Sequence, residues 1–121
     1  MCGITGFISS EYDKNDLIRM TESLAHRGPN ASGLFYNKSE NIGLGHRRLS
    51  VLDLSEESNQ PMNSHNSRYV MVFNGEIYNY KTIADKLNIS LKTSSDSEVL
   101  LEAFCHWGLE FANELNGMFS I

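Results

Sequence analysis

Apolar residues in the first half of the chain follow strand spacing and helix spacing in turn. Between two of the strand-like runs, Asp13 has the residue type of a helix N-cap. One helix face after it carries Leu17, Met20, Thr21 and Leu24. Gly28-Pro29 should then stop this helix. The strand-like runs are residues 3–9, 32–36 and 42–49.

The middle of the chain combines a polar segment, an apolar run and a turn signal. Residues 55–60 are polar and predict a loop that Pro61 closes. Residues 69–73 form a continuous apolar run, which is typical of a strand buried on both faces. Asn74-Gly75 then predicts a turn, because both residues tolerate a positive φ angle.

The last third of the chain predicts helices followed by a strand. Ser95 and Glu98 have the spacing of a capping box at the start of a helix. The apolar spacing predicts helices at 80–87, 99–107 and 109–115, and a strand at 117–121. Strand blocks separated by helices indicate an α+β protein. Because an unpaired apolar strand invites aggregation, the run at 117–121 leads us to expect a fragment of a longer chain.

Composition and charge exclude several classes of protein. The 121 residues suffice for one domain, and 40% hydrophobic with 21% charged residues is typical of globular proteins. A formal net charge of −5 argues against a general nucleic-acid binder. No apolar stretch approaches the roughly 20 residues of a membrane span, and the start has no signal-peptide pattern. We therefore expect no nucleic-acid partner, no membrane association and a cytoplasmic location.

The cysteines and histidines give no sign of a disulfide framework or a metal site. Cys2 and Cys105 are the two cysteines, which favours a reducing compartment. Cys105 falls in a helical apolar run, where a buried and inert thiol is expected. The four histidines lack metal-ligand spacing with the cysteines or with each other, so no metal is expected.

Cys2 has a special position, directly after the initiator Met1. Removal of Met1 would leave a residue that carries both a thiol and a free α-amine. An α-amine has an ordinary pKa of about 8, so it can accept a proton near neutral pH. One residue would then provide the nucleophile and the general base, as N-terminal threonine nucleophiles do.

Other motifs combine glycine with charged or amide side chains, and each has a simple structural explanation taken alone. Gly28-Pro29 can be a helix stop, adjacent arginines can be solvated charge, and Asn74-Gly75 can be a hairpin turn. Asp96 at a helix start is favourable against the helix dipole without any functional role. The motifs are His26-Arg27-Gly28-Pro29, Gly45-His46-Arg47-Arg48-Leu49-Ser50, Asn74-Gly75-Glu76-Ile77-Tyr78-Asn79 and Ser95-Asp96.

Together with Cys2-Gly3-Ile4, and in this order, the motifs resemble the glutaminase domain of glutamine-dependent asparagine synthetases, a class II glutamine amidotransferase. The resemblance runs from residue 2 to residue 121. It implies an N-terminal-nucleophile hydrolase fold, a four-layer αββα sandwich, of which residues 1–121 would be an N-terminal portion incomplete at its C-terminus. The resemblance leads us to expect that residues 1–121 do not include the synthetase domain. ATP and Mg are expected there alone, with no cofactor in this domain.

The resemblance also implies a role for each site residue. Cys2 would attack the side-chain amide of glutamine, and the Asn74 amide with the Gly75 backbone N–H would stabilise the oxyanion. The remaining residues would bind substrate or order a loop: Arg48 for the α-carboxylate, Asp96 for the α-ammonium, the backbone around Glu76 to frame the site, and Arg27 to organise the loop over it. Asn30 stands where the family usually has Asp, which removes a charge beside the pocket.

The implied function is hydrolysis of glutamine to glutamate and ammonia, which a C-terminal synthetase domain of the parent chain would use to make asparagine. The parent could assemble as a homodimer. Two alternatives stay open, an amidotransferase half for a different acceptor and a non-catalytic, truncated glutamine-binding remnant. A thiol redox protein is a weaker alternative, because the sequence has no C-x-x-C motif.

Overall fold

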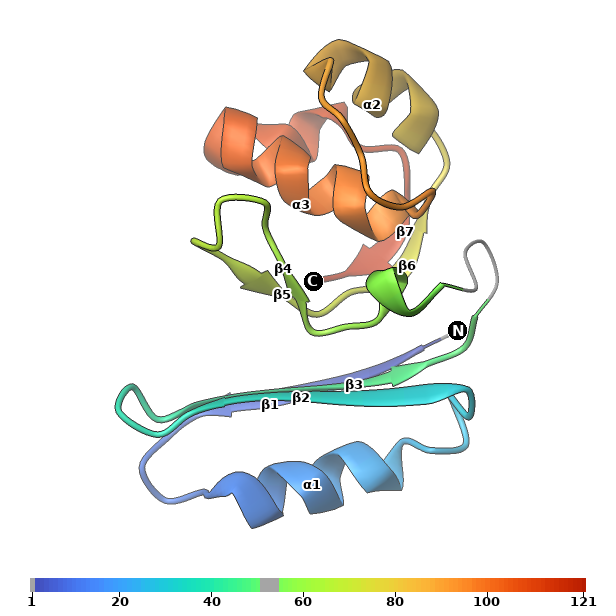
Figure 1. Cartoon of the computed structure of the whole chain (residues 1–121). Coiled ribbons are helices and arrows are strands. Elements are labelled where there is room, and N and C mark those ends of the chain that lie inside the picture. The colour runs from blue at the N-terminus through green and yellow to red at the C-terminus, as the bar shows by residue number, and fades with distance from the viewer. Residues whose placement is uncertain (1, 51–54) are drawn as a thin grey trace.

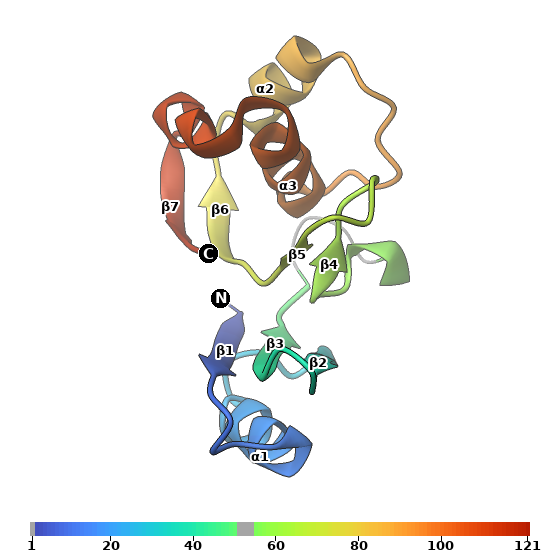
Figure 2. The ribbon, with the colours of Figure 1, turned by 90° about the vertical axis from the view of Figure 1, so that its left-hand side faces the viewer.

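The computed structural model describes residues 2–50 and 55–121 and has an α+β architecture, in which small antiparallel sheets lie between helices (Figure 1). From one end of the molecule to the other, the layers are a helix, a three-stranded sheet, two short strand pairs and a pair of helices. The turned view keeps the first helix beyond the three-stranded sheet and the helix pair beyond the short strands (Figure 2). No described helix combines the length and the apolar character that crossing a membrane requires.

The first half of the chain folds into the three-stranded sheet and the helix that covers it. Its central strand pairs antiparallel with both neighbours, with Gly3 opposite Arg47 and Ala31 opposite Arg48. Leu17 of the helix is fully buried, in line with the predicted apolar face. The elements are β1 Gly3–Ile8, α1 Lys14–Ser23, β2 Ala31–Asn37 and β3 Ile42–Arg48, so the three predicted strands are confirmed.

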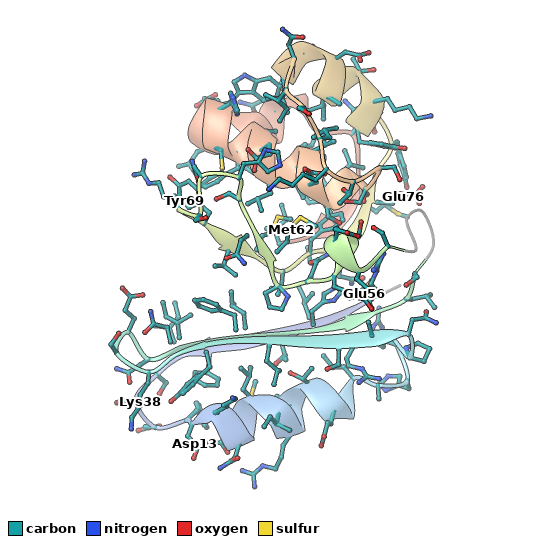
Figure 3. The ribbon with its side chains drawn as sticks, in the orientation of Figure 1. Asp13, Lys38, Glu56, Met62, Tyr69 and Glu76 are labelled. Atoms are coloured by element: carbon teal, nitrogen blue, oxygen red, sulfur yellow. The ribbon has the colours of Figure 1, made fainter. Side chains whose placement is uncertain are left out.

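Asp13 caps α1 as the sequence predicts, and it lies at the start of the helix in Figure 3. Its carboxylate accepts from the backbone N–H groups of Asn15 and Asp16, and the Asp16 side chain accepts from the Asp13 N–H in return. The helix ends at Ser23, earlier than the predicted stop at Gly28-Pro29. Backbone turns continue the chain from there, with the Arg27 N–H donating to the Leu24 carbonyl at 2.9 Å.

The middle segment forms two short strand pairs, and one of the predictions for it is wrong. Asn74-Gly75 does not form a turn but begins β6, which pairs antiparallel with the strand near the end of the chain. Local turn preference yields here to pairing with a strand that is distant in sequence. The predicted strand at 69–73 is paired over a shorter range. The elements are η1 Glu56–Ser58, β4 Met62–Asn63, β5 Val70–Met71, β6 Asn74–Ile77 and β7 Gly117–Ser120.

The helices after β6 are α2 Tyr80–Leu87, α3 Asp96–Trp107 and the 3-10 helix η2 Gly108–Glu114, as the sequence predicts apart from their exact type and ends. The capping box at α3 is half formed. The Ser95 hydroxyl accepts from the Glu98 N–H at 3.3 Å, but the Glu98 carboxylate accepts from the N–H groups of Lys92 and Thr93 instead. Glu98 therefore ties the preceding loop to α3.

The larger apolar core lies between the short strand pairs and the two helices α2 and α3. Figure 3 shows Met62 among the side chains between the β4–β5 pair and α3. Contacts of His46 with Phe73 and of Gly33 with Gln60 join the first half to this part of the molecule. The buried members of the core are Met62, Met71, Phe73, Ile77, Ile83, Leu87, Val99, Leu100, Leu101 and Ala103.

Candidate active site

Cys2 lies directly before β1 and is held by the residue that follows β3. Its Sγ accepts from the Leu49 N–H at 3.5 Å and lies 3.8 Å from the Leu49 carbonyl oxygen. The Arg27 Nε–H donates to the Cys2 carbonyl at 3.1 Å. Cys2 is half-buried, and Met1 lies outside the described residues. Arg27 therefore fixes the backbone of the candidate nucleophile itself.

Arg48 is buried at the end of β3, while Arg47 is half-buried and contacts a different loop. The Arg48 Nη1 donates to the Ser55 carbonyl and to Asn59 Oδ1, both at 2.7 Å. The Arg47 Nε–H donates to the Gly28 carbonyl at 3.0 Å. These different partners agree with the expectation that neighbouring strand residues point to opposite faces.

Asn30 closes the loop around the end of β3. Its backbone N–H donates to the Arg48 carbonyl, and its Oδ1 accepts from the Ser50 N–H, both at 3.0 Å. A carboxylate oxygen could accept the same bond from Ser50. The change from the family's usual Asp to Asn thus removes a charge here but leaves the acceptor in place.

Asn74, Gly75 and Glu76 form the start of β6. Asn74 Oδ1 is buried and has no hydrogen-bond partner among the described residues, whereas Glu76 is exposed. Gly75 lies against β7, and a Cβ added there would stand 2.3 Å from the Met118 carbonyl oxygen. Such a distance is far inside van der Waals contact. Packing against β7 therefore explains the glycine at position 75 independently of any substrate.

Asp96 occupies the first turn of α3 and reaches back to β6. Its Oδ2 accepts from the Ile77 N–H at 2.9 Å, and the residue is 6% exposed. Burial raises the pKa of the Asp96 carboxyl, an effect that its backbone hydrogen bonds oppose and that the Glu76 charge reinforces. A cation bound beside Asp96 would compensate for the buried negative charge.

The predicted site residues fall into two groups on facing parts of the molecule. One group, Cys2, Arg27 and Arg48, lies around the start of β1 and the end of β3. The other, Asn74, Gly75, Glu76 and Asp96, lies on β6 and the start of α3. Figures 1 and 2 agree in placing the start of the chain beside the beginning of β6. The two groups are thus brought together from segments far apart in sequence.

His46 and Gln60 connect the two groups, and sequence reasoning gave neither a role. His46 Nε2 lies 3.2 Å from the Phe73 carbonyl oxygen, and Gln60 Oε1 accepts from the Phe73 N–H at 2.6 Å. His46 stands inside one of the motifs, but the resemblance assigns it no role. Gln60 belonged to a segment that its polarity predicts to be a loop, so its composition gave no signal.

A second polar cluster begins in the first turn of α3, at Glu98, and contains no predicted site residue. Glu98 and Glu102 are buried, and both contact His65, with 2.6 Å between Glu98 Oε1 and His65 Nε2. Burial opposes ionisation of Glu98, but hydrogen bonds from Thr93, Lys92 and His65 hold the pKa of its carboxyl below its usual range. The described residues contain no cluster of three or more histidine, cysteine or acidic side chains suited to a metal ion.

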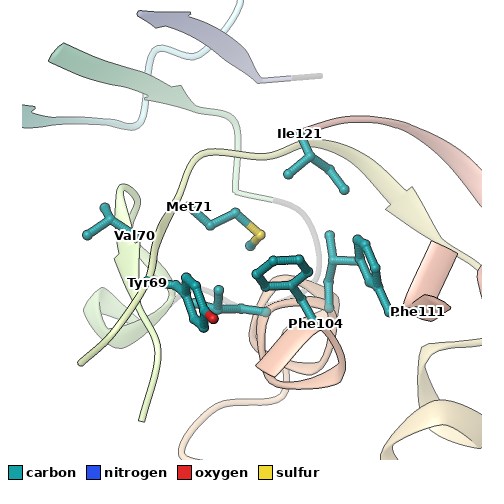
Figure 4. A pocket seen from close by; sticks show the side chains of 8 residues that line it. Tyr69, Val70, Met71, Phe104, Phe111 and Ile121 are labelled. Atoms are coloured by element: carbon teal, nitrogen blue, oxygen red, sulfur yellow. The ribbon is translucent and has the colours of Figure 1, made fainter. Parts of the chain in front are cut away.

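Cys105 and an apolar pocket also lie outside the site. Cys105 is half-buried rather than buried as expected, and burial raises the pKa of its thiol. The pocket has a volume of about 300 Å³ and contains no predicted site residue (Figure 4). It lies between β5, α3 and η2. Its lining consists of Tyr69, Val70, Met71, Leu100, Leu101, Phe104, Phe111 and Ile121.

Comparison with known proteins finds similarity to three longer proteins. A protein of Methanocaldococcus jannaschii, provisionally named glutamine-hydrolysing asparagine synthetase 2, is 38% identical over 99% of this chain and 27% of its own length. Glutamine-hydrolysing asparagine synthetase 1 of Bacillus subtilis is 38% identical over 99% of the chain and 20% of its own length. Amidase chry2 of Gibberella zeae is 36% identical over 99% of the chain and 20% of its own length.

The chain thus spans between a fifth and about a quarter of the relatives that it matches. The sequence model of the family described as "Glutamine amidotransferase domain" matches residues 1–121. This match covers both groups of site residues. The chain belongs to the glutamine amidotransferase domain family.

Proposed function

We propose that this chain hydrolyses glutamine to glutamate and ammonia, with Cys2 as the nucleophile. The contact between Cys2 Sγ and the backbone of Leu49 carries the proposal, because Leu49 directly follows Arg48. The thiol is thereby held at the end of the strand that carries Arg48, whose buried guanidinium suits a carboxylate substrate. Family membership supports the same chemistry.

The proposed reaction requires Cys2 to be the first residue, so that its α-amine takes the thiol proton. The sulfur attacks the side-chain amide carbon of glutamine and forms a C–S bond. Collapse of the tetrahedral intermediate breaks the C–N bond, and ammonia leaves with the proton held by the amine. Water then hydrolyses the γ-glutamyl thioester, which releases glutamate and restores the thiol.

Asn74 and Gly75 would stabilise the oxyanion of the tetrahedral intermediate. The side-chain Nδ2–H group of Asn74 would be the donor, because the amide oxygen Oδ1 can only accept. Loss of one such donor typically costs about 3 kcal/mol of barrier.

Two charged side chains would bind the α-carboxylate and the α-ammonium of glutamine. Arg48 would bind the α-carboxylate, which a guanidinium can do through two parallel hydrogen bonds. Asp96 would bind the α-ammonium, and its burial makes a cationic partner favourable. Arg27 would keep Cys2 in place through the hydrogen bond to its carbonyl.

For the whole protein, we propose an N-terminal-nucleophile hydrolase sandwich followed by a synthetase region that uses the ammonia, with ATP and Mg bound there. The order of layers in Figure 1 supports the αββα sandwich. The greater length of the relatives supports a further region. We also propose a cytoplasmic location, since the catalytic thiol must stay reduced.

The ammonia acceptor has two candidates. The names of the Methanocaldococcus jannaschii and Bacillus subtilis relatives favour aspartate. The similarity to amidase chry2 favours an acceptor other than aspartate as the second candidate. Incubation of the full-length protein with labelled glutamine, ATP and aspartate separates the two, because asparagine forms in the first case and free ammonia accumulates in the second.

The proposal is tested by replacing each cysteine of the full-length protein in turn. Cys2→Ala should abolish glutamate release from glutamine, whereas synthesis from added ammonia should continue. Cys105→Ala is the matched control and should hydrolyse glutamine at the wild-type rate. Equal losses in the two variants, or hydrolysis by Cys2→Ala, would exclude Cys2 as the nucleophile and favour the non-catalytic remnant.

A further inference from the structure

The backbone of Phe73, directly before Asn74, is held by two buried side chains. Its N–H donates to Gln60 Oε1 at 2.6 Å, and its carbonyl oxygen lies 3.2 Å from His46 Nε2. His46, Gln60 and Phe73 are 1%, 6% and 3% exposed. The chain therefore enters β6 with both polar groups of the preceding residue bound by side chains from other segments.

His46 must donate to Phe73, because a carbonyl oxygen can only accept. Burial, with the nearby Arg48 charge, lowers the pKa of His46 to about 4, so the ring is neutral at physiological pH. Its hydrogen is then on Nε2. Nδ1 has no partner among the described residues, so the contact to Phe73 is the one that orients the ring. His46 and Arg48 share a face of β3, since they are two residues apart.

Gln60 continues the connection from Phe73 to α3. Since its Oε1 accepts from Phe73, its Nε2 is the donor, and it lies 3.3 Å from Ser97 Oγ. Ser97 directly follows Asp96 in the first turn of α3. The Gln60 backbone packs against Gly33 of β2, where an added Cβ would stand 2.0 Å from the Gln60 carbonyl oxygen. Gln60 is thereby fixed to the first sheet and to α3.

We infer that His46 and Gln60 are positioning residues that set where Asn74 stands relative to β3 and Asp96. This role rests on the proposed function of Asn74 as an oxyanion donor. The first-half sheet carries the nucleophile, and β6 carries the donor. His46 and Gln60 join these parts through the one residue before the donor. An oxyanion donor must meet the transition state closely, so a shift of Phe73 should act on turnover more than on glutamine binding.

The test measures glutamine hydrolysis by the full-length protein with His46→Leu and Gln60→Leu. Each should lower kcat about 10- to 100-fold, less than outright loss of an oxyanion donor, and change KM less than about threefold. His46→Gln, whose amide can still donate to Phe73, should recover most of the lost kcat. Alkylation of Cys2 by iodoacetamide should keep its wild-type rate in all variants, since the thiol contacts Leu49 and not these residues.

Thr21→Val is the matched control for core damage. Thr21 is 1% exposed, and its hydroxyl donates within α1 to the Leu17 carbonyl at 2.8 Å, away from Phe73. This variant should keep wild-type kcat whatever its unfolding temperature. If a leucine variant does not fold, Ser97→Ala replaces it. Loss of that hydroxyl should lower kcat by about 2- to 10-fold at unchanged KM, the range expected for one hydrogen bond.

The outcomes separate this role from the proposed function. Hydrolysis by Cys2→Ala would defeat the proposed function and this role with it. Wild-type kcat in folded His46 and Gln60 variants, beside an inactive Cys2→Ala, would overturn the positioning role alone. A comparable kcat loss in Thr21→Val would overturn it as well, because general core damage would then explain the effect.

Discussion

Arg47 and Arg48 are neighbours in sequence, yet each binds a different part of the molecule. Arg47 contacts the loop after α1 through the Gly28 carbonyl, and Arg48 contacts the loop around η1 through Ser55 and Asn59. Arg48 is the buried member of the pair. Arg48 is therefore the arginine that we propose as the carboxylate ligand, whereas Arg47 binds the loop that carries Arg27.

Arg48→Ala should raise the KM for glutamine about 10- to 100-fold, because a hydrogen bond to a charged group contributes roughly 1.5–3 kcal/mol. The contact would exist in the ground state and the transition state alike, so kcat should change little. Steady-state hydrolysis by the full-length protein measures both constants.

Arg47→Ala is the control for the loss of an arginine from the same strand, and its KM should stay within about threefold of wild type. Ammonia-dependent synthesis should be unaffected in both variants. Similar KM values for the two variants would show that Arg48 is not the carboxylate ligand.

Among the elements, strand β3 positions both Arg48 and the candidate nucleophile Cys2. One of its faces carries His46 and Arg48, and its end holds Cys2 through Leu49. Hydrogen bonds hold β6 at both ends. Phe73, directly before its start, donates to Gln60, and Ile77 at its end donates to Asp96. The geometry of the site is therefore sensitive to the link between β3 and β6.

This link should make folding stability depend on pH. Burial in the folded state lowers the pKa of His46 from its ordinary value of 6.5 to about 4. Between these values the unfolded state binds more protons, so stability should fall as the pH drops from 6.5 towards 4, by up to about 1.4 kcal/mol per pH unit. Denaturant unfolding of the full-length protein at pH 7 and pH 5 measures the change.

His46→Gln should lose this part of the pH dependence, because glutamine does not titrate. Asp96 has the opposite effect on folding stability above pH 3.8. Its raised pKa makes the folded state bind a proton more readily, so this contribution to stability grows as the pH drops. The difference between wild type and His46→Gln isolates the histidine from it. An equal loss of stability in both proteins would mean that His46 does not titrate as its burial requires.

Apolar spacing in the sequence predicts most of the elements but not the pairing of β6 with β7. Asp13 at α1 and the apolar runs of β1 and β3 are local signals, and the structure confirms them. Asn74-Gly75 has an equally clear local signal for a turn, yet it pairs with β7, near the other end of the second half. Pairing between distant strands leaves no trace in a short window of sequence.

The candidate site residues come from the sequence motifs and not from periodicity, and their roles stay a prediction. Cys2, Arg48 and Asp96 come from a resemblance in which the order of motifs matters. The link through Gln60 was not predictable, because a glutamine in a polar loop resembles any solvated residue. Its amide becomes significant when the fold buries it beside Phe73 and Ser97.

At the scale of the whole molecule, the part around β7 and η2 exposes several large apolar side chains. Met118 and Ile121 are 66% and 54% exposed, and Leu109 is 82% exposed. The pocket beside Phe104 adds an apolar hollow in the same part of the molecule (Figure 4). Exposed apolar side chains favour association between molecules.

Residues 1–121 expressed by themselves should therefore show little glutaminase activity and should tend to aggregate, although every proposed site residue is present. The edge of β7 would stay open to other strands, and catalytic groups need support to within about 0.5 Å of their working geometry. Longer versions, extended toward the length of the relatives, should gain solubility and hydrolysis together. Size-exclusion chromatography and glutamate release measure the two properties on each version. A monomeric 121-residue protein that unfolds cooperatively and matches the hydrolysis rate of the longer versions would show that this exposed surface needs no further cover.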